Sequence, residues 1–195
     1  MSQAPVTKEL NLEIEVKLAC DDLDRLRDAG FVLTLETPRH FEDNWLLDLA
    51  DRSLFRQGAA LRVRSVNGIG TVTYKGVVKE THESRLKVRE EIETAVDEPE
   101  RLIQLFERLG YQRSFRYQKY RTTYRGTLEG SEMKVVLDET PIGNFIEIEG
   151  DEISVLKALD AAGFSASDII RDSYPELQAS RCTARGTPLE DLVFK

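Results

Sequence analysis

The chain has 195 residues, of which 41% are hydrophobic and 32% are charged, and its net charge is −8 at pH 7. This length is ample for a hydrophobic core, and the negative balance disfavours general binding to nucleic acid or to anionic membranes. No apolar run approaches the roughly 20 residues that span a bilayer, and we expect no signal peptide. Because Cys20 and Cys182 are isolated, we expect a cytoplasmic protein without a disulfide framework.

The first predicted strand covers residues 10–19. From Glu13 to Lys17, charged and aliphatic residues alternate strictly, which is typical of a strand with one apolar face and one charged face. Glu13 and Glu15 lie one pleat apart on the charged face. They are either part of a solvated surface or half of a metal site, and a single strand does not decide between the two.

The following segment is predicted to hold a short helix and three strands. Asp21 or Asp22 caps the helix, which ends at Gly30. Residues 34–39 form a polar connection that ends in a turn at Pro38. The later elements are a strand at 40–48, a loop at 50–58, a strand at 60–66, a turn at 67–70, a strand at 71–75 and a polar loop at 76–83.

The strand predicted at residues 85–93 has the densest charge pattern. Its odd positions are Arg85, Lys87, Arg89, Glu91 and Glu93. Residues two apart on a strand lie about 6.5–7 Å apart on one face. The basic residues therefore repel one another unless an anion or acidic neighbours lie opposite. An amphipathic helix follows and ends at Gly110.

The C-terminal half repeats the alternation and ends in helices. A strand at 112–126 places Lys119, Arg121 and Arg125 on one parity. A strand at 133–140 carries Asp138, and a strand at 145–149 carries Glu147 and Glu149 in a pattern that mirrors the first strand. Helices are predicted at 153–162 and 174–185.

These charged faces are predicted to point inward. A sheet with helices on one side and water on the other would carry mixed polar residues on its open face. Same-sign blocks of Arg, Lys, Glu and Asp instead favour an α+β fold, mainly antiparallel β, in which a closed eight-stranded antiparallel β-barrel has helices packed outside. We predict one domain over residues 1–195, with a barrel core at about 10–150 and C-terminal helices at about 151–190.

Enclosed charges of both signs are costly unless they are paired or ligated. The predicted guest is therefore a polyanion complexed to a divalent cation. Arg and Lys would bind the phosphoryl oxygens, and clustered carboxylates would bind Mg²⁺ or Mn²⁺, which prefer oxygen ligands.

Charged motifs follow one another along the chain: Glu13-x-Glu15-x-Lys17, Arg62-x-Arg64, Thr73-Tyr74-Lys75-Gly76, Arg89-x-Glu91-x-Glu93, Lys119-x-Arg121, Leu137-Asp138-Glu139 and Gly143-x-Phe145-x-Glu147-x-Glu149. In this order they resemble the motifs of the CYTH superfamily, the triphosphate tunnel metalloenzymes. They span residues 10 to 185 and look most like the class IV adenylyl cyclase–thiamine triphosphatase branch. The chain departs from that branch at residues 40–48, where Asn44-Trp45 replaces an acidic, tyrosine-rich segment.

The resemblance implies a tunnel that binds a triphosphate with Mg²⁺ or Mn²⁺. The implied metal ligands are Glu13, Glu15, Asp138, Glu147 and Glu149. The implied phosphate-binding residues are Lys17, Arg62, Arg64, Lys75, Arg89, Lys119 and Arg121. The implied catalytic residues are Lys17, Glu91 and Glu93, with Lys17 either a general base or a phosphate contact. Strand parity alone adds Arg85, Lys87 and Arg125 as further phosphate-binding candidates.

Three functions remain open. Hydrolysis of tripolyphosphate, thiamine triphosphate or a nucleoside triphosphate is the leading hypothesis, because it needs only the tunnel. Cyclisation of ATP to cyclic AMP and pyrophosphate also needs an adenine pocket. A non-catalytic polyphosphate-binding module is the third, but a pure anion binder would gain nothing from inward carboxylates. We expect a small-molecule triphosphate as partner, neither nucleic acid nor membrane, and a monomer or homodimer.

Overall fold

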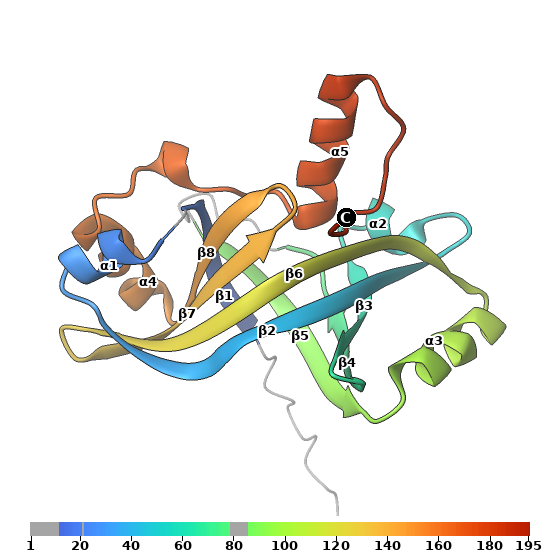
Figure 1. Ribbon diagram of the computed structural model, residues 1–195, viewed down its shortest axis with the longest axis horizontal. Helices are drawn as coiled ribbons and strands as arrows, with labels where there is room; N and C mark the ends of the chain where they lie inside the picture. Colours follow the sequence, from blue (N-terminus) through green and yellow to red (C-terminus); the bar gives the residue numbers. More distant parts are fainter. Residues whose placement is uncertain (1–11, 21, 79–85) are drawn as a thin grey trace, which may run out of the picture.

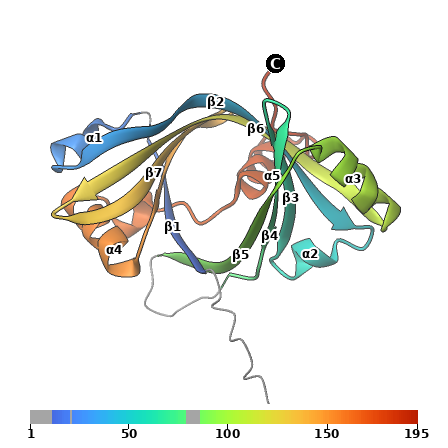
Figure 2. The same cartoon turned by 90° about the horizontal axis from the view of Figure 1, so that it is seen from below.

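The computed structural model describes residues 12–20, 22–78 and 86–195, and its eight strands close into a barrel (Figure 1, Figure 2). Around the barrel the order is β1-β5-β4-β3-β2-β6-β7-β8, and all neighbours are antiparallel. The predicted closed antiparallel barrel is confirmed. The strands are β1 (Leu12–Ala19), β2 (Val32–Leu49), β3 (Ala60–Val66), β4 (Ile69–Lys75), β5 (Lys87–Val96), β6 (Tyr111–Leu128), β7 (Ser131–Thr140) and β8 (Gly143–Glu149).

Strand β1 closes the barrel between β5 and β8 (Figure 1). On the β8 side Glu15 lies opposite Glu149, and Lys17 lies opposite Glu147. On the β5 side Glu15 lies opposite Lys87. Since residues directly opposite on antiparallel strands share a face, this register brings the acidic residues of β1 and β8 beside the basic residues of β5.

The helices lie outside the ring of strands, as predicted (Figure 2). The largest apolar core forms where α1 and α4 cover the outer faces of β1, β7 and β8, around Leu26, Ile148 and Leu159. A second core places Ile103 of α3 against Val63 of β3. The helices are α1 (Asp24–Asp28), α2 (Ser53–Arg56), α3 (Pro99–Arg108), α4 (Glu152–Ala161) and α5 (Tyr174–Arg185), with a 3-10 turn at Ala166–Asp168.

Helix α5 stands at one end of the barrel (Figure 1). The chain leading to it is tied to β1, because the amide of Ile170 donates to the carbonyl of Lys17 at 2.8 Å. Its first residue, Tyr174, packs with Phe115 and Phe145 in a third apolar cluster. Both ties are long-range, so the position of α5 depends on the closed barrel.

The polar connection expected at residues 34–39 is wrong, because β2 runs through it and pairs with β6. Pro38 has no N–H to donate, and the pairing is irregular there, with register shifts on both sides of Thr37. Such bulges let a strand accept a proline. The tertiary pairing with an 18-residue β6 therefore overrides the local turn signal.

Two smaller predictions are also wrong. The loop expected at 50–58 contains helix α2, whose first turn is held by Asp48: its carboxylate accepts from the amides of Leu54 at 3.0 Å and Phe55 at 2.9 Å. The N-cap of α1 is Leu23, without a side-chain cap bond. Asp22 instead accepts from the amide of Asp24, and Asp21 lies outside the described residues.

Strand β5 is described from Lys87 and continues to Val96, beyond the predicted end at 93. Arg85, and most of the loop predicted at 76–83, lie outside the described residues. Over the described ranges, none of the helices has both the length and the apolar character required to cross a membrane.

Candidate functional site

One large cavity lies inside the barrel. Its volume is about 1260 Å³, and every strand contributes to its lining, together with residues 169–176 before and at the start of α5. The charged residues that β1 and β3 to β8 contribute are Glu13, Glu15, Lys17, Arg62, Arg64, Lys75, Lys87, Arg89, Glu91, Glu93, Lys119, Arg121, Lys134, Glu147 and Glu149. The charged faces thus meet inside the barrel.

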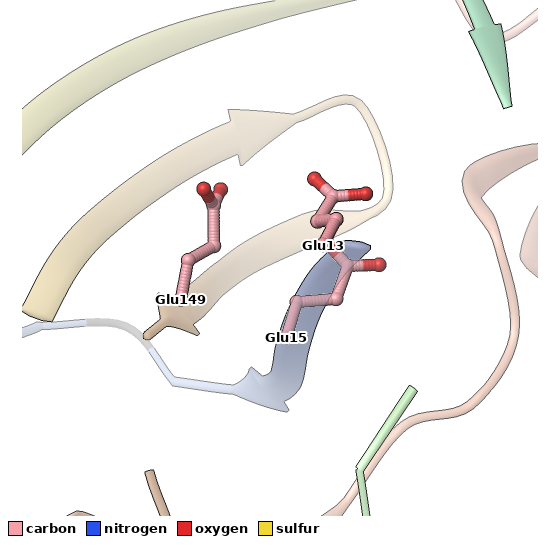
Figure 3. A group of neighbouring side chains, drawn as sticks. All are labelled: Glu13, Glu15 and Glu149. Atoms are coloured by element: carbon pink, nitrogen blue, oxygen red, sulfur yellow. The ribbon is translucent and has the colours of Figure 1, made fainter. Parts of the chain in front are cut away.

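Three of these carboxylates form a compact cluster. Glu13 and Glu15 project from β1 and Glu149 from β8, all on the same side of this strand pair (Figure 3). One oxygen of each lies within 4.8 Å of the others, close to the about 4.2 Å that separates opposite ligands of Mg²⁺. This all-oxygen set fits a hard divalent cation such as Mg²⁺ or Mn²⁺.

Burial raises the pKa of Glu149, because the nearby Lys134 ammonium offsets only part of the lost hydration. Lys134 lies 2.9 Å from the Glu149 carboxylate. A bound cation would reverse this effect, since it favours the ionised carboxylate. The electrostatics of Glu149 therefore agree with the donor chemistry of the cluster.

Cations of the lining contact this cluster directly. The Lys75 ammonium lies 2.9 Å from a Glu13 oxygen, and Arg89 lies 3.5 Å from both Glu13 and Glu15. Lys87 lies 3.9 Å from Glu15. The candidate metal ligands and the candidate phosphate-binding residues are thus neighbours in one cavity.

A second charged group surrounds Asp138, whose carboxylate has no exposed surface. It accepts from Lys119 at 2.7 Å, from Arg121 at 2.7 and 2.6 Å, and from the Tyr174 hydroxyl at 2.8 Å. Burial opposes ionisation, but the charges of Arg121 and Lys119 outweigh it and lower the pKa of Asp138. Asp138 is therefore an ionised anchor for two cations and for α5.

Glu147 connects this group to Lys17. Its carboxylate lies 2.7 Å from Arg121 and 3.5 Å from the Lys17 ammonium. Burial would raise the pKa of Glu147, yet Arg121 and Lys17 outweigh burial and hold the pKa well below its usual range. Lys17 also donates to the carbonyl of Asp172 at 3.3 Å and lies 4.2 Å from the centre of the Tyr174 ring.

A third group lies on β3, β4 and β5. Arg62 is 3.8 Å from Glu91 and 3.5 Å from Glu93, and it donates to Thr73 at 3.0 Å. Lys75 lies 2.6 Å from Glu91. Burial would raise the pKa of Glu91, but a hydrogen bond with the Glu13 carboxyl group and the charge of Lys75 outweigh burial and lower the pKa. Glu91 thus links this group to the carboxylate cluster.

A family model described as the CYTH domain matches residues 11–172. The chain belongs to the CYTH domain family. A protein of Methanocaldococcus jannaschii named "Putative adenylate cyclase MJ0240" is 28% identical over 182 residues, which cover 86% of this CYTH chain and 98% of that protein.

Solved structures share the fold of this CYTH chain. The PH1819 protein of Pyrococcus horikoshii has a TM-score of 0.68 at 26% identity, over 87% of this chain and 99% of that one. A structure from Vibrio parahaemolyticus described as a "putative adenylate cyclase" has a TM-score of 0.68 at 20% identity, over 88% and 99%. HpAC1 of Hippeastrum, described as having "a dominant triphophatase activity", has a TM-score of 0.59 at 21% identity, over 92% and 99%.

Among the described residues, most of the predicted site residues of this CYTH chain line the cavity, but two do not. Asp138 lies behind Lys119 and Arg121, and its bonds leave it apart from the carboxylate cluster. Arg125 is exposed and does not line the cavity. It lies four residues beyond Arg121, or about 13 Å along β6. Arg85 is outside the described residues.

Sequence reasoning missed Glu42 and Tyr174. Glu42 lies on the β2 face opposite to Phe41 and Trp45, so the same parity argument could have found it. This face also carries Leu46 and has no run of charged residues, so the pattern did not indicate a charged inner face at Glu42. Tyr174 carried no sequence signal, because only the docking of α5 on the barrel brings its hydroxyl to Asp138.

Proposed function

We propose that this chain is a divalent-metal-dependent enzyme that hydrolyses a triphosphate inside the barrel cavity. One observation carries the proposal: the carboxylate cluster of Glu13, Glu15 and Glu149 lies in direct contact with the cations Lys75 and Arg89. A metal–triphosphate complex also carries both signs of charge, so its metal ion would face the carboxylates and its phosphates would face the cations. A site for a plain anion would have no use for the carboxylates, which would repel it.

The charge of the lining supports joint binding of metal and triphosphate. In the full cavity lining, positive side chains outnumber negative ones only slightly, and several are paired with one another. A triphosphate entering alone would bring several uncompensated negative charges into a partly buried space, which is costly. A divalent cation on the carboxylates offsets this charge and frees Lys75 and Arg89 for phosphate oxygens.

The proposed roles of the side chains follow from their positions. Arg62, Arg64, Arg89 and Arg121 offer planar donor pairs that match phosphate oxygens, while Lys17, Lys75 and Lys119 act as point charges. Phosphoryl transfer depends mainly on positioning and charge stabilisation. Mg²⁺ or Mn²⁺, held by Glu13, Glu15 and Glu149, would supply Lewis-acid stabilisation of the phosphate charge.

Lys17 follows the two carboxylates of β1 and contacts Glu147 of the group around Asp138. Its ammonium is held by Glu147 and by the carbonyl of Asp172, which supports a role as a phosphate contact over that of a general base. Glu91 and Glu93 hold Arg62, and Glu91 also holds Lys75. We assign these two carboxylates the orientation of phosphate-binding cations in the hydrolysis.

Adenylyl cyclase activity is the second candidate. The M. jannaschii relative carries that name, and part of the lining is apolar, including Leu54, Phe55 and Phe115. Apolar and aromatic side chains with a few polar groups are typical of pockets for organic molecules. This part of the cavity would accommodate the organic group of a nucleotide, which inorganic tripolyphosphate lacks.

One assay separates these functions. Purified protein with Mg²⁺ or Mn²⁺ is offered tripolyphosphate, thiamine triphosphate and ATP in parallel. Release of orthophosphate supports hydrolysis, and the preferred substrate identifies the class. Formation of cyclic AMP and pyrophosphate from ATP would overturn the hydrolysis proposal in favour of cyclisation.

The remaining outcome is tight binding of a triphosphate without turnover of any substrate, which would favour a non-catalytic polyphosphate-binding module. A matched pair of variants guards against a contaminating phosphatase. Glu149→Gln removes one carboxylate of the cluster and is expected to abolish turnover. Glu139→Gln removes an exposed partner of Arg39 outside the cavity and is expected to keep wild-type rates.

A further inference from the structure

Glu42 of β2 is an ionic group that the proposed function does not use. Its side chain is 2% exposed, and it is absent from the cavity lining. It points inward all the same, because it contacts cations that do line the cavity. A buried carboxylate is expensive unless it is paired, so its contacts indicate what it does.

Two of these contacts are with candidate phosphate-binding residues. A Glu42 oxygen lies 3.2 Å from Nη1 of Arg64, and the other lies 3.6 Å from Nζ of Lys119. Glu42 is directly opposite Lys119 in the β2–β6 register. Arg64 is opposite Asn44 in the β2–β3 register, and the Asn44 amide oxygen accepts from its Nε at 3.2 Å. Strand β2 therefore holds these two cations from the side away from the cavity.

The remaining contact of Glu42 is weak. His40 Nε2 lies 3.4 Å from it, and within the described part of the chain its Oε2 atom accepts no hydrogen bond. Burial would raise the pKa of Glu42, but the charges of Lys119, Arg121 and Arg64 outweigh it and lower the pKa. The carboxylate is thus held in place by charge more than by a full set of hydrogen bonds.

The position of Glu42 distinguishes it from the other carboxylates. Glu13 and Glu15 face the cavity and would exchange their cation partners for a metal ion when the guest binds. Glu42 lies behind Arg64 and Lys119, where neither the metal ion nor the triphosphate would replace its contacts. Arg64 and Lys119 would therefore remain anchored while they offer their other N–H groups to the guest.

We propose that Glu42 is a positioning residue, which holds Arg64 and Lys119 from behind in the orientation that places the triphosphate for reaction. This inference rests on the proposed function. It predicts two effects of opposite direction in Glu42→Gln. Loss of the negative charge strengthens anion binding, while loss of the anchor misplaces the bound triphosphate and slows its reaction.

The test compares wild-type protein with Glu42→Gln, using inorganic tripolyphosphate as the probe. Calorimetry without divalent ions measures Kd, and phosphate release with Mg²⁺ or Mn²⁺ measures kcat and KM. In Glu42→Gln we expect Kd to fall by roughly tenfold and kcat to fall by roughly tenfold. A merely structural residue would lower both binding and turnover, or change neither, and either result overturns the proposal.

Asp43→Asn is the matched control, because Asp43 is the next residue on β2 and pairs with Arg116 outside the cavity. It should leave both parameters within about twofold of wild type. Glu42→Asp keeps the charge but shortens the side chain, so Kd should return to the wild-type value with kcat still reduced. If Glu42→Gln does not fold, Glu42→Asp alone decides: a wild-type kcat overturns the proposal.

The outcomes for the wild-type protein keep the two proposals apart. Binding of tripolyphosphate without turnover would refute hydrolysis of this substrate, and the comparison of Kd would still decide the role of Glu42, with an unchanged Kd in Glu42→Gln overturning it. If the wild-type protein binds tripolyphosphate only in the presence of the metal ion, KM replaces Kd in the comparison. A wild-type protein that fails to bind tripolyphosphate both without and with Mg²⁺ or Mn²⁺ would overturn both proposals.

Discussion

Replacing Asp138 by Asn tests whether this carboxylate is a structural anchor. The substitution preserves the shape but removes the charge that holds Lys119 and Arg121. The amide nitrogen faces either Arg121 Nε or the three donors at Oδ2, from Lys119, Arg121 and Tyr174. In either orientation, at least one buried donor loses its acceptor.

The expected magnitude follows from burial. Removing one partner of a buried ion pair costs about 3–5 kcal/mol, because the remaining charge stays buried and uncompensated. This is a large share of the about 5–15 kcal/mol that stabilises a typical domain. With a slope of roughly 2.5 kcal/mol per molar urea, the unfolding midpoint is expected to fall by about 1 to 2 M.

The assay is urea unfolding of wild type, Asp138→Asn and Glu139→Gln, each with and without tripolyphosphate. Glu139 is the adjacent residue on β7, and its exposed pair with Arg39 should contribute less than about 1 kcal/mol. Tripolyphosphate at a hundred times its Kd should add about 2.7 kcal/mol to each folded protein that binds it. A loss in Asp138→Asn no larger than that in Glu139→Gln would refute the reasoning.

Metal binding, acid stability and the anchoring of α5 give three further tests. Glu149→Gln removes one carboxylate of the cluster, so Mn²⁺ affinity measured by calorimetry should fall at least about tenfold; an unchanged affinity would contradict the metal site. Below about pH 4 the unfolded chain takes up protons, whereas the pKa values of Asp138 and Glu147 are lowered in the folded protein. The free energy of unfolding should therefore fall as the pH drops through this window, and less steeply in Asp138→Asn; equal slopes would argue against this origin. Tyr174→Phe removes the hydroxyl bonded to Asp138 and should cost about 1.5–3 kcal/mol in urea unfolding, and wild-type stability would show that this bond does not anchor α5.

The barrel could be predicted because strand alternation is a local property. In β1, β5 and β8, charged and aliphatic residues alternate at the period of the backbone pleat, so each sequence states which residues share a face. In a helix, residues two apart point in different directions, so the alternating charged residues would not share one face. The closed ring then followed from the need to enclose charged faces of both signs, and the structure confirms it.

The route of β2 could not be predicted, because its pairing is not local. Pro38 and the polar residues around it are a turn signal when taken alone. The long partner β6 pairs with this segment across two register shifts, which absorb the missing N–H of the proline. Neither the partner nor the shifts can be deduced from the composition of the segment.

By itself, the sequence determined which residues face inward, since parity depends only on the backbone of each strand. It placed Glu13 with Glu15, Glu147 with Glu149, and the rows of Arg and Lys on the charged faces of their strands, and the family resemblance named these four carboxylates and Asp138 as candidate metal ligands. Only the tertiary structure decided what each inward charge does, because this depends on which neighbours reach it first. Asp138 has the inward parity but is bonded to Lys119, Arg121 and Tyr174 behind the cavity, while Arg125, on the same parity, is exposed outside it.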